Sequence, residues 1–181
     1  MIRRGNLVLS ILAAAIAGLT SAAVCAHSAS DAYLTLTTQQ RPDSARSGKT
    51  LVHGQWDIAL RDLDFVLGLD DDGDGRIVWR ELRRHQQEIA RYAYGYLHAS
   101  VAGKACRVEP TRQMVDYHAD GAYAALFFDV VCDGAPTRLT LDYRMFFAID
   151  PSHRGILVMR SGDEVATAVL SPDNAKIDLP L

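Results

Sequence analysis

The chain has 181 residues, of which 49% are hydrophobic and 23% are charged, and its formal net charge is −3. This length is sufficient for one domain that buries a hydrophobic core. The negative net charge argues against a protein that binds nucleic acid by attraction to phosphates.

The N-terminus has the features of a targeting segment. Two arginines precede an apolar run at residues 7–19, and small residues follow as far as Ala26. This order is typical of a secretory signal peptide. We therefore predict that residues 1–26 are cleaved off and that the protein is exported to the periplasm or the extracellular space. The run is shorter than the ~20 residues that a membrane-spanning helix needs. A lipoprotein attached through Cys25 is a further alternative, although the three residues before it match a lipidation signal poorly.

We expect residues 27–181 to form a single domain that begins with two β-strands. Polar and apolar residues alternate over 31–39 and again from residue 52 to residue 60, which is the period of a strand with one buried face. A loop rich in Pro, Ser and Gly separates the two strands. Asp62 is a favourable N-cap for a short helix over 63–67.

An acidic stretch at residues 70–81 follows this short helix. It has acids at positions 1, 3, 5 and 12, a glycine at position 6 and an isoleucine at position 8. This is the ligand spacing of an EF-hand calcium loop. Ca²⁺ prefers about six to eight oxygen ligands. We therefore predict Ca²⁺ binding by the carboxylates of Asp70, Asp72, Asp74 and Glu81 and by the backbone carbonyl of Arg76.

The alternative interpretation is an acidic turn exposed to solvent, but Gly75, Ile77 and Glu81 also match the calcium pattern. Val78 at position 9 has no side-chain oxygen, and the sequence contains no second loop with which this one could pair. We expect a modest affinity, with a Kd of about 10⁻⁴–10⁻³ M, and a structural role in preference to a switch. Without a second loop for the usual β contact at position 8, Ile77 must bond to the sandwich, to another copy of the chain, or to nothing.

The remainder of the chain changes from helical to strand periodicity. We predict a long helix over residues 79–99 and then strands near residues 104–108, 114–118, 122–132, 139–147, 156–159 and 165–170. The predicted fold class is mainly β (α+β), an antiparallel immunoglobulin-like β-sandwich. The EF-hand helix–loop–helix is expected as an insertion at about residues 62–99.

Two of the three cysteines, Cys106 and Cys132, remain after removal of the signal peptide. An even pair in an oxidising compartment is expected to form a disulfide. Two buried free thiols are the alternative.

The sequence offers little sign of catalysis. It contains no Gly-x-Ser-x-Gly, His-Glu-x-x-His or Cys-x-x-Cys motif and no glycine-rich phosphate loop. We therefore predict that the protein is not an enzyme and has no small-molecule substrate. The six histidines include no pair at the spacing of a ready metal site. His27, as the predicted mature N-terminus, could chelate a transition metal through its amine and imidazole.

Several segments together resemble a known family. They are residues 30–34, 56–63, 120–123 and 147–155, with the acidic loop and the two cysteines. They are similar to the exported N-terminal region of HupE/UreJ-type membrane proteins, whose membrane half is implicated in nickel or cobalt handling for hydrogenase and urease. The present chain ends without that half. The resemblance therefore implies an extracytoplasmic accessory module and not transport itself.

Two hypotheses follow for the function. The first is an exported calcium-binding module, in which Ca²⁺ is structural and the surface docks on a membrane protein partner. The alternative is a periplasmic nickel- or cobalt-binding accessory domain that uses His27 and other histidines and acts with a membrane transporter.

Overall fold

The computed structural model describes residues 31–38 and 48–181. The predicted signal peptide, its cleavage after Ala26, and His27 all lie outside the described residues. In chain order the described elements are β1 (Asp31–Thr38), β2 (Lys49–Ala59), α3 (Leu60–Leu67), α4 (Trp79–Tyr94), β3 (Leu97–Val101), β4 (Lys104–Ala105), β5 (Arg107–His118), β6 (Gly121–Asp133), β7 (Arg138–Tyr143), β8 (Arg154–Ser161), β9 (Glu164–Leu170) and β10 (Lys176–Pro180).

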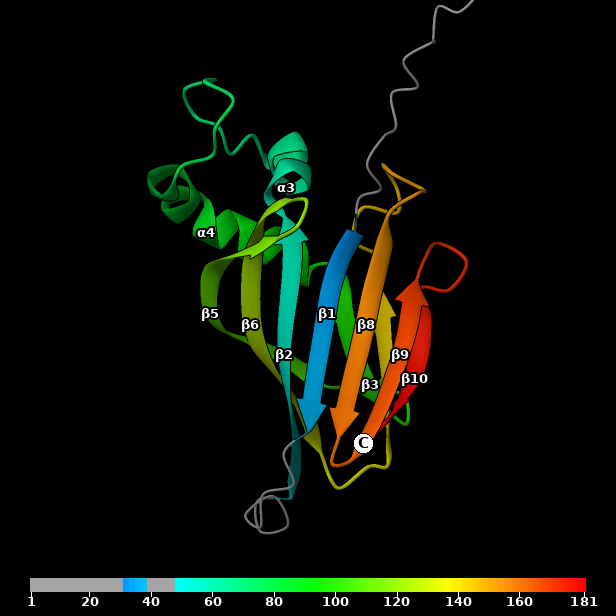
Figure 1. Ribbon diagram of the computed structural model, residues 1–181. Helices are drawn as coiled ribbons and strands as arrows, with labels where there is room; N and C mark the ends of the chain where they lie inside the picture. Colours follow the sequence, from blue (N-terminus) through cyan, green and yellow to red (C-terminus); the bar gives the residue numbers. More distant parts are fainter. Residues whose placement is uncertain (1–30, 39–47) are drawn as a thin grey trace, which may run out of the picture.

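The strands form two sheets. The larger sheet has the order β5-β6-β2-β1-β8-β9, and the smaller has the order β10-β7-β3-β4. Strands β1 and β8 pair in parallel, whereas the other pairs in these two sheets are antiparallel. In Figure 1 the smaller sheet lies behind the larger one. The predicted fold class, a mainly β (α+β) sandwich, is confirmed.

Aromatic side chains join the layers of the core. Trp56 on β2 and Tyr143 on β7 are both fully buried, and their rings meet edge to face with centroids 5.5 Å apart. Helix α4 adds Tyr94, whose ring packs against that of Phe128 on β6 at 5.7 Å. Offset and edge-to-face aromatic pairs of this kind stabilise beyond the area that they bury. The two sheets and α4 therefore share one core.

The two helices lie at one end of the sandwich, and the loop between them projects away from the sheets (Figure 1). Helix α3 continues directly from β2, with Ala59 as its N-cap residue. The prediction that Asp62 is the N-cap was wrong, because Leu60 is already helical and buried in the core. Asp62 lies in the first turn, where a negative charge is favourable to the helix dipole.

Helix α4 ends at Tyr94, earlier than the predicted end near residue 99. Gly95 has a low helix propensity, and residues 97–101 form β3, which pairs with β7. Leu97 and Ala99 are buried whereas His98 between them is exposed, which is the period of a strand. The helical insertion therefore spans a shorter segment than 62–99.

The predicted strand at 104–108 is divided between β4, in the smaller sheet, and the start of β5, in the larger sheet. The predicted strand at 114–118 also lies in β5, which has a bulge at Thr111, between Pro110 and Arg112. Strand β5 is an edge of the larger sheet, and an edge strand tolerates a proline because its N–H need not pair. Strand β7 ends at Tyr143, and β10 was not predicted.

The predicted disulfide between Cys106 and Cys132 is present. It joins the residue just before β5 to the end of β6, at the edge of the core.

Candidate metal centre

The acidic loop begins where α3 is brought to a stop. Gly68 ends the helix with a left-handed backbone (φ 64°), which glycine adopts without steric cost. The side chain of Asp64 then accepts hydrogen bonds from the backbone N–H groups of Leu69, at 2.7 Å, and Asp70, at 3.0 Å. Leu69 is also fully buried in the core. The backbone of Asp70, the first predicted ligand, is therefore held in position by the hydrogen bond from its N–H and by the buried residue that precedes it.

The carboxylate of Asp70 organises the loop from within. Its Oδ1 accepts a hydrogen bond from the N–H of Gly73 at 2.9 Å, and its Oδ2 accepts one from Gly75 at 2.8 Å. Both glycines have positive φ angles, 72° and 80°, so the turn requires residues that tolerate left-handed backbone. The chain thus curls around the Asp70 side chain.

The next two acids follow the same pattern. Asp72 Oδ1 accepts a hydrogen bond from the N–H of Asp74 at 3.3 Å, and Asp74 Oδ1 accepts one from Arg76 at 2.8 Å. As a result, carboxylate oxygens of Asp70, Asp72 and Asp74 all lie within 4.8 Å of one another. Three carboxylates this close repel one another in the absence of a cation. Three of the predicted ligands are therefore gathered at one point.

Glu81 is not a member of this group. Its side chain is almost completely buried, with 1% exposed, and it connects the start of the loop to the start of α4. Oε1 accepts a hydrogen bond from the N–H of Asp71 at 3.1 Å, and Oε2 accepts one from Val78 at 2.8 Å. Glu81 thus caps α4 as well as closing the loop. Arg76 is exposed, and the ligand role of its carbonyl stays a prediction.

Asp71, which is not a predicted ligand, attaches the loop to α4. Its two oxygens contact Arg84 Nη1 at 2.7 Å and His85 Nε2 at 3.0 Å. His85 also contacts Glu88 through Nδ1 at 2.8 Å. The hydrogen bonds from His85 and Arg84 lower the pKa of Asp71, and those to Asp71 and Glu88 raise the pKa of His85. The charged forms of these side chains therefore favour each other.

Ile77, at position 8 of the loop, is half-buried and packs against the core of the sandwich. It also borders a hollow of about 210 Å³ whose lining includes Gly121 and Tyr123 at the start of β6. The Ile77 side chain therefore contacts the domain itself, whereas no β-pairing of Ile77 is found among the described residues, so the bonding partner stays open.

No protein-family model and no curated protein matches this chain. The EF-hand loop and the resemblance to HupE/UreJ-type proteins stay predictions. Among the residues that the structure describes, neither helix has the length and apolar character needed to cross a membrane.

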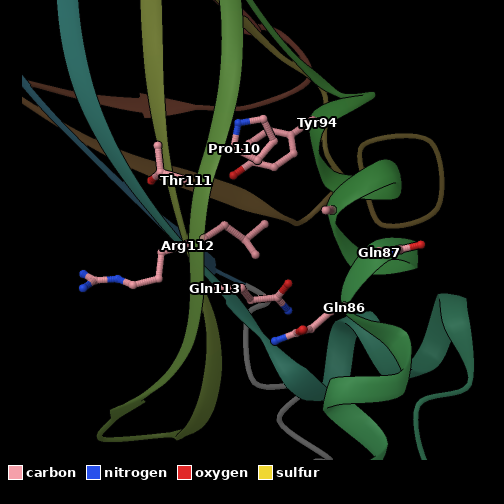
Figure 2. Close-up of a pocket in the computed structure, with 9 residues that line it drawn as sticks. Gln86, Gln87, Tyr94, Pro110, Thr111, Arg112 and Gln113 are labelled. Carbon is pink, nitrogen blue, oxygen red and sulfur yellow. The ribbon is translucent and has the colours of Figure 1, made fainter.

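A second hollow lies between α4 and β5 and has a volume of about 240 Å³ (Figure 2). The residues that line it include Gln86, Gln87 and Tyr94 from α4 and Pro110, Arg112 and Gln113 from β5. In Figure 2 the Arg112 side chain points away from the helix, and its guanidinium lies over the ring of Phe127. The Nε2 of Gln113 is buried there without a hydrogen-bond partner. The lining contains no carboxylate, imidazole or thiol, and the prediction that the protein is not an enzyme stays a prediction.

Several polar residues of the site were not predicted from the sequence. The capping role of Asp64 has a recognisable signal, an acid in the last turn of a helix that ends at glycine. The contact of Asp71 with Arg84 and His85 has no such signal, because it depends on how α4 turns after the loop. A second group of potential metal ligands, Asp57 with two residues of β5, was also missed.

Proposed function

We propose that this protein is an exported calcium-binding module with a single EF-hand-type loop. The observation that carries the proposal is the convergence of carboxylate oxygens from Asp70, Asp72 and Asp74 within 4.8 Å of one another. Oxygen ligands at this density suit Ca²⁺, which is a hard cation. A nitrogen or sulfur ligand, which would favour a transition metal, is absent from this group.

The arrangement of the loop supports a preorganised site. Asp70, Asp72 and Asp74 are oriented by backbone N–H groups of the loop itself. In the calcium-bound protein, Glu81 exchanges at least one of its N–H contacts for the ion, and the backbone carbonyl of Arg76 supplies a further oxygen. Because Val78 provides no side-chain oxygen, water completes the shell and the affinity is modest.

The role that we propose for the ion is structural. The loop joins α3 to α4, and both helices contribute buried residues to the single core. An ion that neutralises the loop carboxylates holds the two helices in the arrangement in which Leu69 and Ile77 reach that core. The module acts outside the cytoplasm and docks on a membrane protein partner.

A nickel- or cobalt-binding role through His27 is the alternative. His27 lies outside the described residues, and His85, on α4, is engaged by Asp71 and Glu88. The contacts of His85 therefore give this alternative no support over calcium.

The test is a thermal melt followed by circular dichroism with and without Ca²⁺. A ligand that binds only the native state adds RT ln(1 + [L]/Kd), or about 2.7 kcal/mol at a concentration 100 times Kd. For a Kd of about 10⁻⁴ M, about 10 mM Ca²⁺ should therefore raise the melting temperature by roughly 5–10 °C. The same concentration of Mg²⁺ should have a smaller effect, because Mg²⁺ demands a tighter octahedral shell.

Matched variants show whether the calcium-dependent shift in melting temperature arises at the loop. Asp70→Asn should remove most of the calcium-dependent shift, since it weakens the ligand that organises the loop. Asp173→Asn makes the same chemical change at an exposed residue outside the loop and should keep the full shift. A wild-type melt that Ca²⁺ leaves unchanged would reject the proposal, as would an equal shift in Asp70→Asn.

A further inference from the structure

A second cluster of potential metal ligands lies on the outer face of the larger sheet. It consists of Asp57 on β2 with Asp116 and His118 on β5, and one ligand atom from each lies within 4.8 Å of the other two. Unlike the calcium loop, this cluster includes an imidazole and brings together residues from distant parts of the sequence. Only 6% of Asp57 is exposed.

The bulge in β5 is the reason that these side chains share a face. Before the bulge, Pro110 pairs with Phe128, whose side chain points into the core. After it, Asp116 pairs with Tyr123 and His118 with Gly121, and this register places them on the outer face. One extra residue in a strand reverses the faces of the residues that follow. Without the bulge at Thr111, Asp116 and His118 would point away from Asp57.

The tip of the β5–β6 hairpin brings His118 within reach of Asp57. In Figure 1 this tip bends across the top of the sheet toward β2 and α3. The ring of His118 stacks on that of Tyr33, with centroids 4.6 Å apart, and lies 4.2 Å from that of Tyr123. At the tip, Asp120 contacts Arg61 at 3.2 Å and accepts a 2.8 Å hydrogen bond from the Tyr123 hydroxyl. The imidazole is therefore held by rings on two sides.

The separation between His118 and Asp57 is compatible with a shared ion. His118 Nε2 lies 3.2 Å from Asp57 Oδ2, whereas the His53–Asp129 pair on the same face is separated by 2.7 Å. A charge-assisted N–H···O bond is typically about 2.7–2.9 Å long. Two donors bound at ~2.0–2.1 Å to one tetrahedral ion are about 3.3 Å apart. The separation between His118 and Asp57 is that of a long hydrogen bond and is also that of two ligands of one ion.

The surroundings supply an outer shell and an entry path. The Nε2 of Gln55 donates to both oxygens of Asp57, at 2.9 and 3.2 Å, which fixes the carboxylate as outer-shell partners of metal ligands do. Asp116 is exposed and accepts a hydrogen bond on Oδ1 from the N–H of Tyr117. Solvent can therefore approach from the side of Asp116.

We propose that Asp57, Asp116 and His118 bind a divalent transition-metal ion of the zinc type. Two carboxylates and one imidazole are a donor set that such ions accept, with water in the remaining position. Ca²⁺ is disfavoured here, because its ligands in proteins are oxygens. The site is independent of the calcium loop, so either proposal can fail without the other.

The test is calorimetric titration of the chelator-treated full chain with Zn²⁺, in excess Ca²⁺ so that the loop is occupied. The expected result is saturable binding that His118→Ala and Asp116→Asn each weaken at least ~100-fold, since changes in the outer shell alone cost about 10–100-fold. His53→Ala removes the neighbouring His–Asp pair and should leave Zn²⁺ binding unchanged.

Asp116→Asn keeps the test decisive if His118→Ala does not fold, because Asp116 is exposed and its replacement should leave the melting temperature unaltered. Absence of saturable Zn²⁺ binding in the wild type would overturn the proposal. So would Zn²⁺ binding that both variants retain, since the ion would then be bound elsewhere in the chain.

Discussion

The carboxylate of Asp64 accepts a 3.0 Å hydrogen bond from the backbone N–H of Asp70, the first predicted calcium ligand. An acid that is not itself a predicted ligand thus sets the position of one that is predicted to bind the ion. The same oxygen also accepts the N–H of Leu69, so that the end of α3 and the start of the loop are joined at one atom.

Two replacements of Asp64 should therefore distinguish its role in positioning the loop from the effect of its negative charge. Asp64→Ala removes the acceptor and should destabilise the calcium-free protein by about 1 kcal/mol and weaken Ca²⁺ binding by roughly tenfold. Asp64→Asn keeps an oxygen acceptor and should retain most of the affinity. Calorimetric Ca²⁺ titration and melts in EDTA measure both quantities. Equal loss of affinity in the two variants would show that charge, and not position, is what Asp64 contributes.

Gly54 and Phe128 are paired across β2 and β6, and the Phe128 ring fills the space that a Cβ at Gly54 would occupy. Gly54→Ala should destabilise the protein by about 1–3 kcal/mol or more, because a packed core has no room for the added methyl group. Urea unfolding measures this loss. In a Phe128→Leu background the same change should cost less, as a double-mutant cycle would reveal. A cost unaffected by residue 128 would contradict the steric explanation.

The Cys106–Cys132 disulfide closes a segment with a sequence separation of 26. The double variant Cys106→Ser, Cys132→Ser should lower the free energy of unfolding by about 3–4 kcal/mol, because the unfolded chain regains the freedom that the crosslink removes. Urea unfolding at fixed Ca²⁺ concentration is the measurement, with the reduced wild-type protein as the control. A loss below about 1 kcal/mol would mean that the crosslink constrains little.

Asp150 makes part of the stability of the protein dependent on pH in the acidic range. The hydroxyl of Ser152 donates a 2.6 Å hydrogen bond to Asp150 Oδ1, and this bond is the main reason that the pKa of Asp150 lies below its ordinary value of 3.8. A carboxylate whose pKa is lowered by folding stabilises the native state above that ordinary value. This contribution is lost as the pH falls below 3.8 and through the folded pKa.

Ser152→Ala should raise the pKa of Asp150 and so reduce the part of the stability that acid removes. Titration of the Asp150 carboxyl by NMR measures the shift directly, and Ser152→Thr, which keeps the hydroxyl, is the control. An unchanged titration in Ser152→Ala would assign the low pKa to the remaining causes, which are the backbone hydrogen bonds and the electrostatic effect of His153.

The features that could be predicted from the sequence are local in the chain. The spacing of Asp70, Asp72 and Asp74 predicted a loop that gathers carboxylates, since each side chain bonds to a backbone N–H only a few residues away. The alternation along β2 and β6 predicted buried strands for the same reason. In long, regular segments the spacing of apolar residues is itself enough to predict the secondary structure.

The features that were missed depend on distant parts of the chain. Leu97 suits the stripe of a helix and the face of a strand equally well, and only the pairing of β3 with β7 decides between them. The bulge at Thr111 has no signal beyond the preceding proline, yet it determines which face Asp116 and His118 occupy. The second cluster could have been suspected from the Asp-x-His spacing on a strand, but its partner Asp57 could not.

The parallel pairing of β1 with β8, from Asp31 beside Arg154 to Thr38 beside Ser161, has a consequence for biosynthesis. A ribosome releases β1 long before it makes β8, so the nascent strand has a partner on one side only. An unpaired edge of this kind readily joins strands of other chains. The larger sheet can therefore be completed only after β8 has been made, and a fragment that stops before β8 should aggregate.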